Sequence, residues 1–140
     1  MTGYPPRAGG VRILARYAGE ITTKAPRARR RFQRAVRHNL RDASASTGTA
    51  ARIEVAGSRI VVSSKDRAAL HVAARVFGIA SVSEVEAVCP ATETAIVETG
   101  AACFRDRVRG RTYAVRARRR PRGNPSSQRI NEVGPPAPTA

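Results

Sequence analysis

The stretch ARIEVAGSRIVV, residues 51–62, predicts a β-hairpin and decides the fold. Its two halves, Ala51–Val55 and Arg59–Val62, are rich in β-branched residues, which favour strands. Between them, Ala56-Gly57-Ser58 has the length and the glycine of a short hairpin turn. A hairpin makes its two strands antiparallel, so the sheet that contains this stretch is at least partly antiparallel.

The segments on either side of the hairpin complete a small α+β domain. Upstream, Val11–Tyr17 alternates as a strand does, Gly19–Lys24 is predicted as a loop, and a helix begins at Pro26 and runs to about Asp42. Downstream, Ser64 is predicted to cap a helix from Lys65 to about Val76, and a strand follows from about Ser81 to Val88. The resulting order βαββαβ predicts a ferredoxin-like domain, which has an antiparallel four-stranded sheet with two helices on one face.

The first helix has an apolar stripe and a basic face. Phe32, Val36 and Leu40, helped by Ala35, follow the helical period. A second face carries four arginines at intervals of four, three and four residues: Arg30, Arg34, Arg37 and Arg41. Like charges at this spacing destabilise a helix by a few tenths of a kcal/mol per pair. Phosphate groups that neutralise them would explain their presence.

The chain continues beyond the βαββαβ region. Thr92 is predicted to cap a third helix that reaches about Val108, where Gly110 ends it, and Thr112–Ala117 is predicted as a strand. A basic loop and a fourth helical stretch, from Ser126 or Ser127 to Gly134, come next. We therefore predict a flexible lead-in (residues 1–10), a ferredoxin-like domain (11–88), a partial second α/β domain (89–134) and a disordered tail (135–140).

The net charge is +16, and it is concentrated in two blocks. Residues 27–41 contain seven arginines and residues 105–122 contain nine, whereas residues 42–104 have five basic and seven acidic residues. A GC-rich genome, whose codons favour arginine, explains the abundance of arginine but would scatter it evenly along the chain. Two separate blocks favour nucleic acid over a membrane surface as the partner.

The sequence predicts no catalytic or metal centre. Cys89 and Cys103 form no CxxC pair, and His38 and His71 are not near them at ligand spacing. Two unpaired thiols fit a reducing, cytoplasmic location. No apolar run approaches 18 residues, so no membrane-spanning segment is expected.

Three segments resemble the N-terminal region of the tRNA 4-thiouridine synthases, which are tRNA sulfurtransferases also linked to thiamine biosynthesis. Tyr17–Lys24, followed by the Arg-rich helix with Phe32, is similar to the family's first strand, Gly-Glu-Ile loop, lysine and helix. Phe77–Val85 is similar to its Gly-Ile turn and last ferredoxin-like strand. The two parts of the third segment, Thr112–Arg119 and Ser126–Gly134, resemble the opening half of a THUMP domain.

The resemblance implies a tRNA-binding module that grips the acceptor stem for uridine thiolation and is not catalytic by itself. The family enzyme uses ATP, but no cofactor is expected on this chain, because its Gly-rich pyrophosphatase loop and rhodanese-like cysteine are missing here. Asn124-Pro125 also stands where the family usually has an aromatic residue. The residues expected to contact RNA are Lys24, Arg30, Arg34, Arg37, Arg41, Arg116, Arg118, Arg119, Arg120 and Arg122.

Several alternatives stay open at this point. The chain fits a ribosomal or ribosome-associated rRNA-binding protein, since many of these are small, basic and ferredoxin-like. It also fits one part of a sulfurtransferase whose pyrophosphatase-loop domain is encoded separately, or a truncated remnant. A half-built THUMP sheet would leave an open strand edge, which allows a homodimer.

Overall fold

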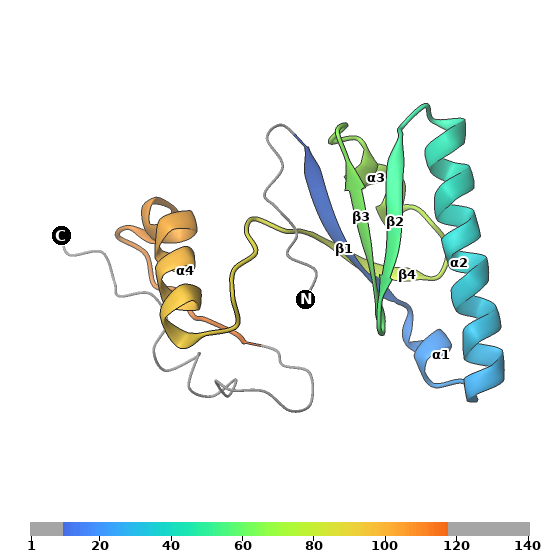
Figure 1. Ribbon diagram of the computed structural model, residues 1–140, viewed down its shortest axis with the longest axis horizontal. Helices are drawn as coiled ribbons and strands as arrows, with labels where there is room; N and C mark the ends of the chain where they lie inside the picture. Colours follow the sequence, from blue (N-terminus) through green and yellow to red (C-terminus); the bar gives the residue numbers. More distant parts are fainter. Residues whose placement is uncertain (1–9, 118–140) are drawn as a thin grey trace. The chain divides into compact units, whose positions relative to one another are not determined.

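The computed structural model describes residues 10–117, with a boundary between two compact units after Glu86. The first unit is a sheet with helices packed against it (Figure 1). Its elements are, in order, β1 (Val11–Tyr17), α1 (Gly19–Thr22), α2 (Pro26–Ser46), β2 (Ala51–Ala56), β3 (Arg59–Ser64), α3 (Ala69–Ala74) and β4 (Ile79–Glu84). Apart from the short helix α1, this is the predicted βαββαβ order.

The four strands form one antiparallel sheet in the order β2-β3-β1-β4. The hairpin of β2 and β3 pairs Val55 with Ile60 and closes at Gly57, whose φ of 63° suits a residue without a side chain. The first and last strands therefore lie side by side although the whole unit separates them in sequence. This strand order and the antiparallel pairing confirm the ferredoxin-like fold.

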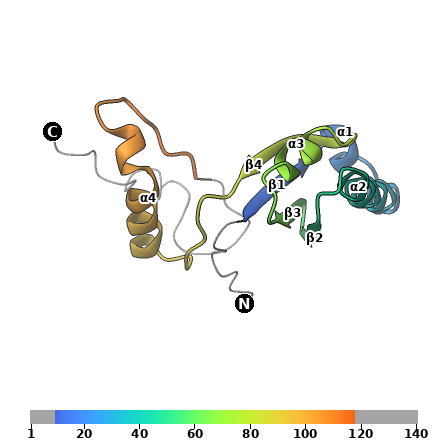
Figure 2. The ribbon, with the colours of Figure 1, turned by 90° about the horizontal axis from the view of Figure 1, so that it is seen from above.

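The hydrophobic core lies between one face of this sheet and the helices α2 and α3. Every second residue of β1 is buried, and its partners across β3 point to the same side, as in the pairs Ile13–Val62 and Ala15–Ile60. Leu40 of α2 is buried against them at 1% exposure. Figure 2 shows α2 and α3 on one side of the strands. The arginines and serines of the opposite face are thus separated from the core.

Helix α2 begins at Pro26 as predicted, but its buried stripe and its C-terminal end differ from the prediction. Its buried residues are Val36, Leu40 and Ser44, whereas Phe32 is 42% exposed and Ala35 is exposed. The first turns of α2 lie beside α1 instead of over the strands, so the apolar stripe begins one turn later than expected. The helix also continues to Ser46, past the predicted end near Asp42.

Two other predicted boundaries in this unit were wrong. The predicted loop Gly19–Lys24 contains α1, which the hydroxyl of Thr22 closes by donating to the Gly19 carbonyl (2.9 Å). Ser64 does not cap a helix, because it pairs as the last residue of β3 and its hydroxyl donates to the Ala50 carbonyl (2.7 Å). Helix α3 starts only at Ala69, after a turn in which the Asp66 carboxylate accepts the Ala68 N–H (2.8 Å).

The last strand is shifted towards the N-terminus relative to the predicted Ser81–Val88. Gly78, with a φ of 91°, turns the chain early enough for Ile79 to pair with Tyr17. Pairing ends near Glu84, opposite Ile13, because little of β1 remains beyond that point. The available partner, and not the apolar pattern, sets the length of β4.

The second unit contains α4 (Glu93–Val108). As predicted, the Thr92 hydroxyl caps this helix by accepting the Ala95 N–H (3.3 Å), and Gly110 follows its end with a φ of 69°. Thr112–Ala117, however, forms no strand. Of residues 87–117, only Glu93–Val108 forms a regular element, α4. The predicted fourth helical stretch lies outside the described residues.

Candidate nucleic-acid interface

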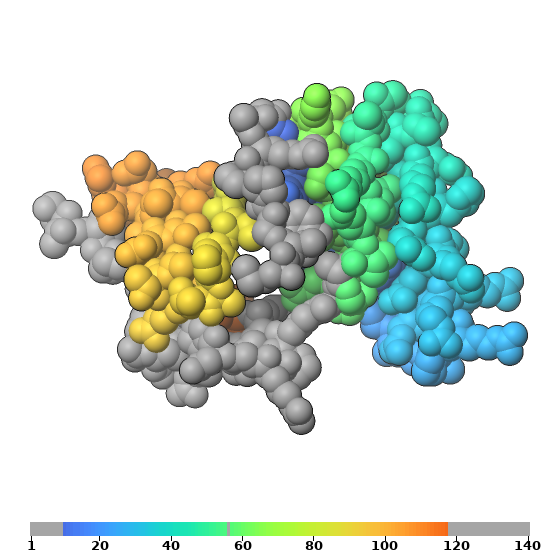
Figure 3. All heavy atoms as spheres, viewed as in Figure 1, coloured from blue at the N-terminus to red at the C-terminus, as the bar shows by residue number. Residues whose placement is uncertain are grey.

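The four arginines predicted on α2 lie on a face of the helix that is distinct from its buried stripe. Pro26 starts the helix, and the side chains of Arg30, Arg34 and Arg41 are exposed, while Arg37 is half-buried beside the core residue Val36. Figure 3 shows long side chains of the first half of α2 standing away from the neighbouring atoms. We call Arg30, Arg34, Arg37 and Arg41 the α2 arginine row.

The arginine row has no acidic counterpart in the described part of the chain. None of its members forms an ion pair with another described residue, and the one acid of α2, Asp42, is paired with His38 (3.1 Å). Elsewhere in the unit, by contrast, Arg52 pairs with Glu54 (2.6 Å) and Arg67 makes two hydrogen bonds of 2.7 Å to Glu84. The positive charge of α2 therefore remains available to an outside anion.

Three members of the row line a pocket of about 340 Å³. Arg30, Arg34 and Arg37 contribute the helical side, together with Gln33. The sheet contributes Tyr17, at the end of β1, and Val55, near the end of β2. Arg41, one turn beyond Arg37, is not part of the lining.

Two polar atoms at this pocket are buried without a hydrogen-bond partner among the described residues: the Tyr17 hydroxyl and Nε of Arg37. Tyr17 as a whole is only 5% exposed. Burial raises the pKa of the Tyr17 hydroxyl, and the nearby charge of Arg37 opposes this shift. At neutral pH the hydroxyl therefore stays protonated and can donate a hydrogen bond.

The remaining predicted residues are not among the residues that line this pocket. Lys24 sits between α1 and α2, with its Nζ 4.7 Å from the ring centroid of Phe32, a cation–π contact. Arg116 is exposed in the segment that follows α4, in the second unit. Arg118, Arg119, Arg120 and Arg122 lie outside the described residues. Of the ten predicted residues, the structure brings together Arg30, Arg34 and Arg37.

A basic set that the sequence analysis missed lies on the sheet face opposite the core. Strand alternation places Arg12, Arg16, Arg52 and Arg59 there, on three neighbouring strands. Arg16 donates to the hydroxyls of Ser81 (3.3 Å) and Ser83 (3.2 Å) on β4. These four arginines lie outside both basic blocks of the sequence, but the period-two placement of arginines in the predicted strands would have revealed the face.

Arg16 and Arg59 face each other directly across β1 and β3. Like charges opposite one another in a sheet are destabilising, by roughly 0.2–1 kcal/mol. We expect Arg59→Thr to raise the free energy of unfolding by about 0.5 kcal/mol, measured by urea denaturation. The control is Arg52→Thr, which removes an arginine that is paired with Glu54; an equal gain in the control would contradict the repulsion.

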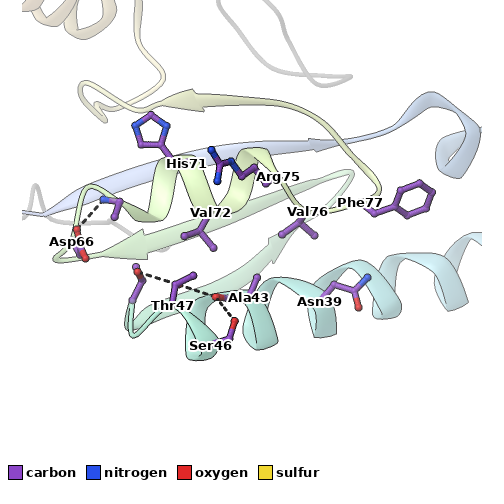
Figure 4. Close-up of a pocket in the computed structure, with 12 residues that line it drawn as sticks. Asn39, Ala43, Ser46, Thr47, Asp66, His71, Val72, Arg75, Val76 and Phe77 are labelled. Atoms are coloured by element: carbon purple, nitrogen blue, oxygen red, sulfur yellow. Dashed lines mark hydrogen bonds between the residues drawn. The ribbon is translucent and has the colours of Figure 1, made fainter.

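A second groove, of about 560 Å³, runs between α2 and α3 (Figure 4). Val72 of α3 and Val76, which follows α3, point into it towards Ala43 of α2, while the ring of Phe77 points away. Phe77 is 88% exposed. The lining of this groove mixes apolar and polar groups, and Asp66, His71 and Arg75 are among the polar ones. The groove lacks the concentrated positive charge of the pocket at Tyr17.

The profile of the ThiI ferredoxin-like domain matches residues 12–83, which are β1 to β4 of the first unit. The chain belongs to this family. Over 111 residues, or 76% of this chain, it is 36% identical to a probable tRNA sulfurtransferase of Aeropyrum pernix. It is 31% identical over 107 residues to a probable tRNA sulfurtransferase of Saccharolobus solfataricus. The match spans 28% of the length of each of these two relatives.

Two further findings complete the comparison. No solved structure gives a significant match to the chain. Within residues 10–117, no helix is both long and apolar enough to cross a membrane. Membership of the ThiI ferredoxin-like domain family confirms the resemblance inferred from the sequence, and it assigns the first unit to the ferredoxin-like part of that family.

Proposed function

We propose that this chain binds tRNA for the thiolation of uridine, gripping the acceptor stem through the α2 arginine row and the second basic block. The α2 arginine row carries the proposal, because no described residue neutralises its charge. The names of the two relatives, probable tRNA sulfurtransferases, support tRNA as the nucleic acid.

The recognition proposed here depends on charge and shape. From Arg30 to Arg41 the helix rises about 16 Å, so the row presents a line of positive charge and not a single point. Guanidinium groups bind phosphate oxygens through paired N–H donors, which fix the position of the RNA without reading its sequence. Double-stranded RNA is recognised mainly in this way, since side chains do not read its narrow major groove. Selection of tRNA would then rest on the acceptor-stem geometry and its single-stranded 3′ end.

The chemistry of thiolation is assigned to another domain in this proposal. The family enzyme uses ATP, and a nucleotide of this kind is held by a Gly-rich loop that cradles its phosphates. We propose that ATP does not bind to this chain. We expect a pyrophosphatase-loop domain to act on the tRNA that this chain holds.

A comparison of two RNAs tests the choice of tRNA over ribosomal RNA. The dissociation constants of an acceptor-stem minihelix with its single-stranded 3′ end and of an rRNA hairpin of equal length are measured at the same ionic strength. We expect the minihelix to bind about tenfold more tightly, a difference of about 1.4 kcal/mol. Equal or tighter binding of the rRNA hairpin would support the ribosomal alternative instead.

A further inference from the structure

The pocket at Tyr17 has the features of a built anion site. Arg30, Gln33, Arg34 and Arg37 occupy positions i, i+3, i+4 and i+7, which face one direction on a helix. They stand opposite Tyr17 and Val55, so α2 supplies the positive charge and the sheet supplies a largely apolar wall. Three guanidinium groups around one pocket exclude a cation as its occupant.

The unpartnered groups at the pocket indicate what the occupant must offer. Leaving a buried donor without an acceptor destabilises a protein, and folded proteins rarely do so. Both groups here, the Tyr17 hydroxyl and the Nε–H of Arg37, are hydrogen-bond donors, and neither has an acceptor among the described residues. The missing complement is therefore a group with several acceptor oxygens and negative charge, which describes a phosphate.

The size and position of the pocket favour a phosphate that belongs to a polymer. Its volume of about 340 Å³ lies at the lower end of small-molecule sites, which span roughly 300–1,000 Å³. It therefore has room for the attached ribose, and Val55, which is 47% exposed, supplies an apolar contact. Arg41 continues the positive charge along α2 beyond the pocket, where the next phosphates of a chain would follow.

We infer that the pocket lined by Tyr17, Arg37 and their neighbours binds one backbone phosphate of an RNA. Tyr17 and Nε of Arg37 donate to it from inside the pocket, and Arg30 and Arg34 contact it from the rim. This inference rests on the proposed function but is narrower, because it names the one phosphate that is held by buried groups.

Two conservative substitutions test the site in the full chain. Tyr17→Phe removes only the hydroxyl, and Arg37→Lys keeps the charge but removes Nε–H. We expect each to weaken binding of the acceptor-stem minihelix about tenfold, as for loss of a hydrogen bond to a charged group. Tyr17→Phe should at the same time raise the melting temperature without RNA, since it removes a buried donor that has no partner. Arg75→Lys, at the residue that follows α3 and outside the pocket, is the matched control for Arg37→Lys and should leave the affinity unchanged.

NMR of the Arg37 Nε–H signal distinguishes the sources of the phosphate. The minihelix, a nucleoside monophosphate and inorganic phosphate are titrated separately, and we expect the minihelix to shift this signal at the lowest concentration. If inorganic phosphate shifts this signal at the same concentration as the minihelix, the assignment of the pocket to RNA is overturned. Unchanged minihelix affinity in both variants would overturn the pocket but leave the proposed function standing. If the unsubstituted chain binds no minihelix, the proposed function itself fails.

Discussion

Replacing Gly78 by alanine lowers the free energy of unfolding by about 3 kcal/mol. Gly78 has a φ of 91°, a conformation that L-residues rarely adopt. A Cβ at this position would lie 2.5 Å from Cγ2 of Val36 and 3.1 Å from Cδ1 of Ile21. The backbone cannot easily move away, because the Gly78 carbonyl accepts the Ala18 N–H (2.8 Å) next to the end of β1. The substitution therefore adds a steric clash in the core to the conformational strain.

A matched control separates the clash from the strain. Gly48 also has a positive φ, 69°, but a Cβ there would meet nothing within 4 Å. We expect Gly48→Ala to lower the free energy of unfolding by only about 1 kcal/mol, the strain of a left-handed residue. Both variants are compared with the unsubstituted chain by urea denaturation, followed by circular dichroism. Equal losses in the two variants would show that the packing of Gly78 against α2 is not as described.

If the chain binds tRNA as proposed, reversing two charges of the arginine row should lower the affinity about a hundredfold, or about 2.8 kcal/mol. The variant combines Arg34→Glu and Arg41→Glu, which changes two attractive phosphate contacts into repulsive ones. The same changes relieve the crowding of like charges on α2, so the helix should be no less stable than before. Loss of binding therefore cannot be attributed to unfolding, and the melting temperature checks this point.

The control for this variant carries the same change of net charge elsewhere in the first unit. Lys65→Glu with Arg75→Glu alters two exposed residues outside α2. If binding depends on the arginine row, the affinity of the control for tRNA should fall only slightly, because only its net charge is lower. A loss as large as that of the α2 variant would mean that the total charge, and not its position on α2, determines tRNA binding.

The alternation of apolar residues and the turn at Gly57 were enough to predict the strands of the first unit and their sequence along the chain, because both are local signals. Local signals failed where a distant partner decides the structure. Ser64 looks like a helix cap but is held in the sheet by Val11 and Ala51. Thr112–Ala117 alternates as a strand does but forms no strand.

In the candidate site, too, local features could be predicted from the sequence and tertiary ones could not. The helical spacing of Arg30, Arg34 and Arg37 was visible in the sequence. The sequence did not show that they line one pocket with Tyr17 and Val55, because this depends on how α2 packs across the end of the sheet. The alternation of β1 places Tyr17 on the buried face, but the lack of a hydrogen-bond partner for its hydroxyl among the described residues is a tertiary property.

The dependence of tRNA affinity on salt tests the central claim most directly, namely that the basic face of this chain binds tRNA through its phosphates. The association constant of unmodified tRNA with the full chain is measured between 50 and 200 mM salt, roughly the range over which counterion release is conspicuous. If Lys24, the pocket at Tyr17 and Arg41 neutralise one phosphate each, the logarithm of this constant should fall against the logarithm of salt concentration with a slope at least as steep as about −2.5. A slope near zero, or no binding at the lowest salt, would contradict the claim.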